Sequence, residues 1–181
     1  MGTTETQTTI PTGTWKSDPI HSDVGFAVRH VTGTFRGSFV DFDVVLTAGA
    51  AEPRLLGALR VESVQVRDEN LNGHLLSPDF FDTERHPQIT FESSALHADG
   101  DGIVVEGDLT LKDTTKAVEA RGRITEPLVG LDGKERIGLD LETTVDRAEI
   151  GLDWNAPLPH GGMVLGDRVA ITVHLELVKE E

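Results

Sequence analysis

Apolar residues recur at every second position over most of the chain, which is typical of strands with one buried face. In DRVAITVHLELV (167–178), Val169, Ile171 and Val173 alternate with polar or small residues. The same alternation returns in DVGFAVRHV (23–31), LLGALRV (55–61), QITFES (88–93), GIVVEGDLTL (102–111), KAVEARGRI (116–124) and RIGLDLETTV (136–145). Each of these segments therefore predicts a strand.

The segment TFRGSFVDFDVVL (34–46) changes parity within itself. Phe35 and Phe39 share one parity, whereas the other parity holds Val40, Phe42, Val44 and Leu46. A single regular strand cannot place both sets on one face, so we expect a bulge or bend near Gly37. With this segment the chain predicts about eight strands, separated by hairpin-like turns and without a long helical period.

Alternating strands of this kind build either two packed sheets or a closed barrel. Several glycines, among them Gly57, Gly107 and Gly122, fall inside the predicted strands. Such glycines permit strong coiling of a sheet. We therefore predict an all-β fold, an eight-stranded antiparallel β-barrel.

The stretch RDENLNGHLLSPDFFDTERHP (67–87) departs from the strand pattern. Asp68 is placed to cap a helix that carries Leu71 and Leu75 one turn apart. Ser77 and Pro78 then predict the start of a second short helix. We expect one or two short helices here that close one end of the barrel, with Trp154 either at the same end or packed on a loop.

Length and composition fit one domain over 13–181, preceded by a disordered, Thr-rich tail over 1–12. The start, MGTTET, also matches a loose N-myristoylation pattern, although disorder is the favoured interpretation. No signal peptide and no run of 18 apolar residues is present, so we expect a cytoplasmic protein without a membrane span. The net charge of −15 argues against nucleic acid as a partner.

The polar residues show no spacing that is typical of a metal or catalytic site. There is no cysteine, and the seven histidines show no His-x-His, His-x3-His or HExxH pattern. Arg67 with Asp68, and Asp82 with Arg85, suit acid and base roles or ion pairs and caps, and the structural role is favoured. We therefore expect no metal ion and no catalytic residue.

The order of several motifs resembles the YceI-like family of polyisoprenoid-binding proteins. These motifs are SDPIHSDVGFAVRH, RDENLNGHL, DFFDTERHPQITFES, GDLTLKDTTKAV, RAEIGLDW and GDRVAITV. The resemblance implies an extended, lipocalin-like barrel with a long apolar tunnel that holds an isoprenoid chain or a similar amphiphile, commonly in a homodimer. This chain has Asp113, Thr114 and Thr115 where the family usually has Gly-Val-Thr, has Leu139 where it has an aromatic residue, and lacks the export signal of many relatives.

The resemblance and the strand parity together give an expected binding site. The apolar lining would be Phe26, Val28, Phe35, Phe39, Phe42, Val61, Leu71, Leu75, Phe80, Phe81, Phe91, Leu109 and Leu139. The lipid head group would meet His30, Arg67, Asp68 and His74. The expected ligand is a lipid such as a prenyl quinone, with no other cofactor. Two alternatives remain: an enzyme or isomerase that acts on an apolar substrate in the same pocket, and an interaction module whose lumen is filled by side chains.

Overall fold

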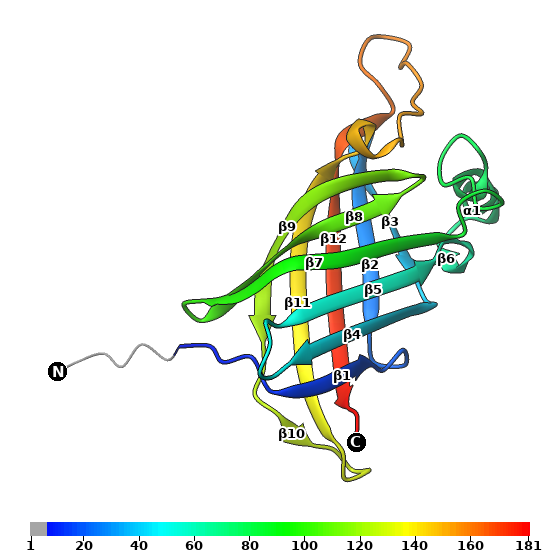
Figure 1. Ribbon diagram of the computed structural model, residues 1–181. Helices are drawn as coiled ribbons and strands as arrows, with labels where there is room; N and C mark the ends of the chain where they lie inside the picture. Colours follow the sequence, from blue (N-terminus) through cyan, green and yellow to red (C-terminus); the bar gives the residue numbers. More distant parts are fainter. Residues whose placement is uncertain (1–6) are drawn as a thin grey trace.

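The computed structural model describes residues 7–181 and consists mainly of antiparallel strands (Figure 1). The strands are β1 (Gly13–Ser17), β2 (Asp23–His30), β3 (Gly33–Phe39), β4 (Phe42–Ala48), β5 (Arg54–Arg60), β6 (Val64–Gln65), β7 (Gln88–Asp99), β8 (Gly102–Leu111), β9 (Thr114–Ile124), β10 (Leu128–Val129), β11 (Glu135–Asp146) and β12 (Leu165–Lys179). The helices are α1 (Glu69–Leu76) and two 3-10 turns, η1 (Val61–Ser63) and η2 (Ala148–Ile150).

Eight strands close into a ring in the order β11, β9, β8, β7, β5, β4, β1 and β12. The ring is completed by β11 and β12, which pair from Arg136 opposite Val178 to Asp146 opposite Arg168. Each strand of the ring therefore has a hydrogen-bonded partner on both sides, and the alternating pattern places one face of every strand in the interior. The predicted eight-stranded antiparallel barrel is confirmed.

The barrel wall divides along β12, the longest strand. One edge of β12 pairs with β2 between Leu165 and His174, and the same edge pairs with β1 only at Leu177, Val178 and Lys179. From β2 the sheet continues through β3 to β6, whereas from β1 it continues through β4 to β5. The strands β2, β3, β6 and β10 are therefore additions to the closed ring.

The parity change in the segment 34–46 has a different cause from the predicted bulge. β3 ends at Phe39 and β4 begins at Phe42, so two separate strands replace one bent strand. The pairing of β2 with β3 runs through Gly37 without a shift in register, so the prediction of a bend there was wrong. Gly37 instead makes room for Phe26, because an added Cβ would lie 2.5 Å from the Phe26 ring.

The chain between β5 and β7 bridges the two branches of the divided wall. It leaves β5 at Arg60, pairs with β3 through β6, and then forms α1. The Asp68 carboxylate caps α1 by accepting hydrogen bonds from the main-chain nitrogens of Asn70 and Leu71, at 2.9 and 3.1 Å. The predicted first helix and its cap are confirmed.

The predicted second helix does not form, and residues 78–81 adopt turns. Ser77 ends α1, since its main-chain nitrogen donates to the His74 carbonyl. The main-chain nitrogens of Phe81 and Thr83 donate to the carbonyls of Leu75 and Leu76. The chain thus folds back over the C-terminal end of α1, where its hydrogen bonds satisfy helix carbonyls and compete with a new helix.

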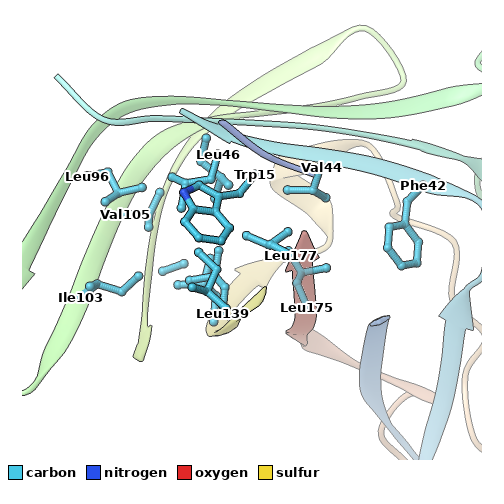
Figure 2. Packing of buried hydrophobic residues seen from close by; sticks show 14 residues of the cluster. Trp15, Phe42, Val44, Leu46, Leu96, Ile103, Val105, Leu139, Leu175 and Leu177 are labelled. Carbon is cyan, nitrogen blue, oxygen red and sulfur yellow. The ribbon is translucent and has the colours of Figure 1, made fainter. Parts of the chain in front are cut away.

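The buried side chains of the barrel form two clusters. One surrounds Trp15, which is 0% exposed and lies among Leu46, Leu139 and Leu177 (Figure 2). The other joins α1 and its connection to the barrel through Phe39, Leu75, Phe80, Phe81, Val145 and Ile150. No helix among residues 7–181 is long and apolar enough to cross a membrane.

Part of the N-terminal tail can be located on the barrel. Residues 1–6, which include the myristoylation pattern, lie outside the described residues. The main-chain nitrogen of Thr8 donates to the carbonyl of Gly100, and Ile10 packs against the Trp15 cluster. Residues 7–12 therefore contact the domain without forming a helix or strand.

Candidate functional site

An apolar cavity of about 330 Å³ lies inside the barrel. Its walls include Phe42 and Leu175 of the Trp15 cluster and Phe39 and Leu75 of the α1 cluster, so the cavity lies between the two. Strands from both branches of the wall contribute to the lining. The volume is within the range of small-molecule sites, and the lumen is not filled by its own side chains.

The Trp15 cluster closes one end of this cavity. Trp15, Leu46 and Leu177 are each 0% exposed and do not line the cavity. Their side chains meet across the barrel from β1, β4 and β12 (Figure 2). The Trp15 indole nitrogen donates to the carbonyl of Pro11 at 3.3 Å, which ties the tail to this end.

The opposite end of the cavity reaches the surface beside α1. Leu71 of α1 and His30 at the end of β2 both line the cavity and are exposed. Three rings pack next to them: His74 lies 4.9 Å from Phe80 and 4.8 Å from Trp154 between ring centroids, and Phe80 lies 5.3 Å from Trp154. We call this end the mouth. Of the two places expected for Trp154, it thus occupies the one at the end of the barrel that α1 covers.

The structure brings most of the predicted apolar residues together around the cavity. Those that line it are Phe26, Val28, Phe35, Phe39, Phe42, Leu71, Leu75, Phe80, Phe81, Phe91 and Leu109. Val61 and Leu139 do not line it. Val61 begins a 3-10 turn, where the alternation of faces stops, and packs in the α1 cluster. Leu139 points inward as expected, but it lies at the end where inward side chains meet, in the Trp15 cluster.

Two of the four predicted head-group residues lie at the cavity, and two do not. His30 and His74 line it, and the His74 ring lies 3.0 Å from the Asp79 carboxylate through Nε2. Asp68 and Arg67 are exposed and are not part of the lining. Asp68 is used as the cap of α1, because both of its hydrogen bonds run to the first turn of that helix.

A residue absent from the sequence prediction, Arg147, also lines the cavity. It is 5% exposed, and among residues 7–181 it is the only buried polar or charged side chain. Its guanidinium donates to the carbonyl oxygens of Gly166, Leu152 and Trp154 at 2.8, 2.6 and 2.9 Å. The sequence contained part of the signal, since Arg147 continues the spacing of two that joins Leu141 to Val145, although β11 itself ends one residue earlier, at Asp146.

A polar network lies on the outside of the barrel, away from the cavity. Asp18 binds His21 at 2.8 Å and Arg136 at 2.9 Å, and Arg136 also binds Asp132 and Glu176. The hydrogen bond from His21, together with that from Arg136, lowers the pKa of Asp18 from 3.8 to about 2. Asp18 in turn raises the pKa of His21 above 6.5.

This network also contains three potential metal-ligand atoms, but a side chain already occupies the space between them. The ligand atoms of Asp18, His21 and Glu176 lie within 4.8 Å of one another. The Nη1 atom of Arg136 is 2.9 Å from both Asp18 Oδ2 and Glu176 Oε2. A cation would have to displace this guanidinium, so the arrangement is that of an ion-pair network.

Comparison with known proteins assigns the fold to a family. The model of the YceI-like domain matches residues 15–177, nearly the whole described chain. The chain belongs to the YceI-like family. A UPF0312 protein of Staphylococcus epidermidis is 30% identical over 167 residues, which cover 88% of this chain and 94% of that protein.

Solved structures similar to this YceI-like chain share its fold. The crystal structure of Burkholderia cenocepacia BcnA has a TM-score of 0.75 and 22% identity, and the match covers 91% of this chain and 99% of BcnA. A polyisoprenoid binding domain from Saccharophagus degradans, implicated in plant cell wall breakdown, has a TM-score of 0.65 and 12% identity, with 94% and 100% of the two chains covered. At these identities the likeness concerns the barrel fold.

Proposed function

We propose that this YceI-like protein binds the chain of an isoprenoid or a similar amphipathic lipid, such as a prenyl quinone, inside its barrel. The protein would carry, store or protect the lipid without changing it chemically. The observation that carries this proposal is the apolar cavity, which is closed by the Trp15 cluster at one end and reaches the surface at the mouth. The polyisoprenoid-binding relative with the same fold supports the choice of lipid.

The energetics of apolar burial suit such a role. Burying about 500 Å² of a prenyl chain would contribute roughly 12 kcal/mol before the entropy of association and of chain ordering is subtracted. Binding at low micromolar concentration or tighter follows from what remains. Since apolar contact has little directional preference, the walls select for a chain, and polar groups at the mouth select for a head group.

Extraction of the purified full-length protein with organic solvent, followed by mass spectrometry, tests the proposal. We expect a stoichiometric amphiphile with a long apolar tail, recovered intact after incubation with the protein. An extract without lipid, together with no binding of added prenyl quinones or prenyl alcohols, would contradict the proposal. Conversion of an added lipid into a new product would instead favour an enzyme that uses the same cavity.

A further inference from the structure

Arg147 places a buried positive charge in the wall of a mainly apolar cavity. Its side chain is 5% exposed, lines the cavity, and follows directly after the last residue of β11, at the mouth end of the barrel. An arginine stays protonated in proteins. Burying such a charge is costly unless a group of opposite charge or several hydrogen bonds compensate for it.

The surrounding protein compensates this charge only in part. Three main-chain carbonyl oxygens accept hydrogen bonds from Nε and Nη1, and Nη2 takes no part in these bonds. Among residues 7–181, the ion pairs of the arginines and lysines do not include Arg147. The neighbouring carboxylate of Asp146 accepts from the main-chain nitrogen of Ala148. The site thus presents a cation that lacks a protein anion.

The other polar side chains of the mouth lie near the same point. His30 of β2 pairs with Leu165 of β12. The next residue, Gly166, accepts a hydrogen bond from Arg147 through its carbonyl oxygen. The ring of Trp154 packs against His74, and its carbonyl accepts from Arg147. Arg147 therefore lies where the apolar cavity meets the imidazoles of the mouth.

We propose that Arg147 is the anchor for an anionic oxygen head group, a carboxylate or a phosphate, on the lipid that occupies the cavity. This inference rests on the proposed function and names the chemical class of its ligand. The head group accepts a hydrogen bond from the guanidinium near the mouth, and the tail extends toward the Trp15 cluster. Charge-assisted hydrogen bonds of this type are about twice as strong as neutral ones, and arginine suits the planar carboxylate and the phosphate alike.

A purely structural role predicts a different behaviour. In that case the guanidinium only ties residues 152 and 154 to β12 through its three carbonyl partners, and the charge of a ligand would not affect its affinity. Ligands that share one tail and differ only in the head group separate these two roles in the unaltered protein, without any substitution.

The first experiment measures the affinity of delipidated full-length protein for geranylgeranoic acid, geranylgeranyl monophosphate and geranylgeraniol. Quenching of tryptophan fluorescence is a suitable signal, because Trp154 lies at the mouth. We expect at least one anion to bind about 10-fold to 100-fold more tightly than the alcohol, as is usual for a hydrogen bond to a charged group. The tighter of the two anions assigns the head group to a carboxylate or a phosphate. Equal affinity for all three would overturn the inference and leave the proposed function intact, whereas no binding of any would refute both.

The second experiment removes the charge. In Arg147→Gln the affinity for the preferred anion should fall to that for the alcohol, with both ligands measured on the same variant. Arg168→Gln, on the exposed face of β12 near the same end, is the matched control and should keep the full preference. An Arg147→Gln protein that still prefers the anion would overturn the inference. If Arg147→Gln does not fold, Arg147→Lys is the second variant, because it keeps the charge but not the planar guanidinium. This variant should retain a smaller preference for the anion. If neither variant binds any ligand, the comparison of head groups on the unaltered protein decides between the two roles.

Discussion

Neighbouring residues on β12 have opposite environments. Ile171 lines the cavity and lies opposite Phe26 of β2, whereas Ala170 is exposed on the outer face. A charge at the first position would have to be buried in the lumen or displace the ligand, and a charge at the second stays in water. This pair therefore distinguishes occupation of the lumen from binding to the outside of the barrel.

Ile171→Asp should reduce lipid retention at least about 10-fold, because a carboxylate in an apolar site is strongly desolvated. Ala170→Asp is the matched control and should retain the lipid. Mass spectrometry of the extracted lipid per mole of folded protein measures both. Equal retention by the two variants would place the ligand elsewhere.

The ion-pair network on the outer surface gives the fold a pH dependence. Because the pKa of Asp18 is lowered to about 2, its stabilising contribution is present above the ordinary value of 3.8 and is lost as the pH falls toward 2. Because the pKa of His21 is raised, its contribution is present below 6.5 and is lost as the pH rises through the raised value. The network is therefore strongest between these two ordinary pKa values.

Asp18→Asn should lower the melting temperature by about 1–3 °C at pH 5, since these groups are partly solvated. The difference from the unaltered protein should shrink as the pH falls to 2, where Asp18 itself becomes protonated, and should partly shrink as the pH rises through the raised pKa of His21, where His21 loses its charge. Scanning calorimetry across this range measures the effect. Asp23→Asn is a control, because Asp23 is exposed and forms no ion pair within residues 7–181. A difference that stays constant with pH would contradict the assignment.

Arg147 shows what single-residue patterns in the sequence contain and what they omit. It continues the spacing of the inward residues of β11 by one position beyond the strand, but the usual preference of arginine for the surface hides its position. Asp68 was correctly identified as a cap, and that role is the reason it is not part of the cavity lining. Alternation along a strand thus predicts which way a side chain points, and its hydrogen-bond partners in the structure determine its role.

At the scale of elements, the connection 61–87 covers the opening between the two branches of the wall. It pairs with β3 through β6 and rejoins the ring at β7, and α1 lies between these points. The helix has eight residues and is too short to be stable alone, so its cap and its contacts through Leu75 hold it in place. The mouth therefore depends on a locally marginal element.

Asp68→Ala should destabilise the protein by about 1 kcal/mol through loss of the two cap hydrogen bonds. Urea unfolding measures the change, and Asp68→Asn should recover most of it, because asparagine also caps helices. Amide hydrogen exchange in α1 should rise more than in β8, which lies in the ring. A uniform rise across the barrel would show that the helix does not open separately.

The elements that sequence patterns predicted are the long, regular ones. β2, β5, β7, β8, β9, β11 and β12 follow from alternation, which the barrel preserves because each has one inward face. The short β1 escaped prediction, since Trp15 is its only large apolar residue, and β6 and β10 have two residues each. The predicted second helix does not form, because the main-chain nitrogens of Phe81 and Thr83 bind carbonyls at the end of α1. These hydrogen bonds outweigh the helix-starting preference of Ser77 and Pro78.

At the scale of the whole molecule, the sequence does not determine how much of the lumen is filled. Alternation specifies which side chains point inward, but whether they meet depends on the distance across the barrel. They meet around Trp15, and they leave a cavity between the Trp15 cluster and the mouth. Family resemblance supplied the prediction of a tunnel, and the structure supplies its closed end.

Affinity should therefore depend on tail length up to a limit. Each added methylene that enters the cavity should contribute about 0.8 kcal/mol, or about fourfold in affinity, until the tail meets the Trp15 cluster. The lining residues of β12 from Leu165 to Leu175 span about 34 Å at about 3.4 Å per residue, which sets the scale of this limit. Titration with a homologous series of prenyl alcohols measures it. Trp15→Ala should move the limit to longer tails while destabilising the fold by about 3–5 kcal/mol, and an unchanged limit would show that Trp15 does not set it.

Under the proposed function, the closed end around Trp15 would also govern how the lipid is exchanged. A cavity with a single opening would admit a lipid tail first and release it head group first. The whole tail would then have to be withdrawn past the aromatic side chains of the mouth. Release would then slow with every carbon held inside, and transfer to a membrane or a second carrier would require the mouth to face the recipient. Residence time, more than capture, would be the property that this architecture controls.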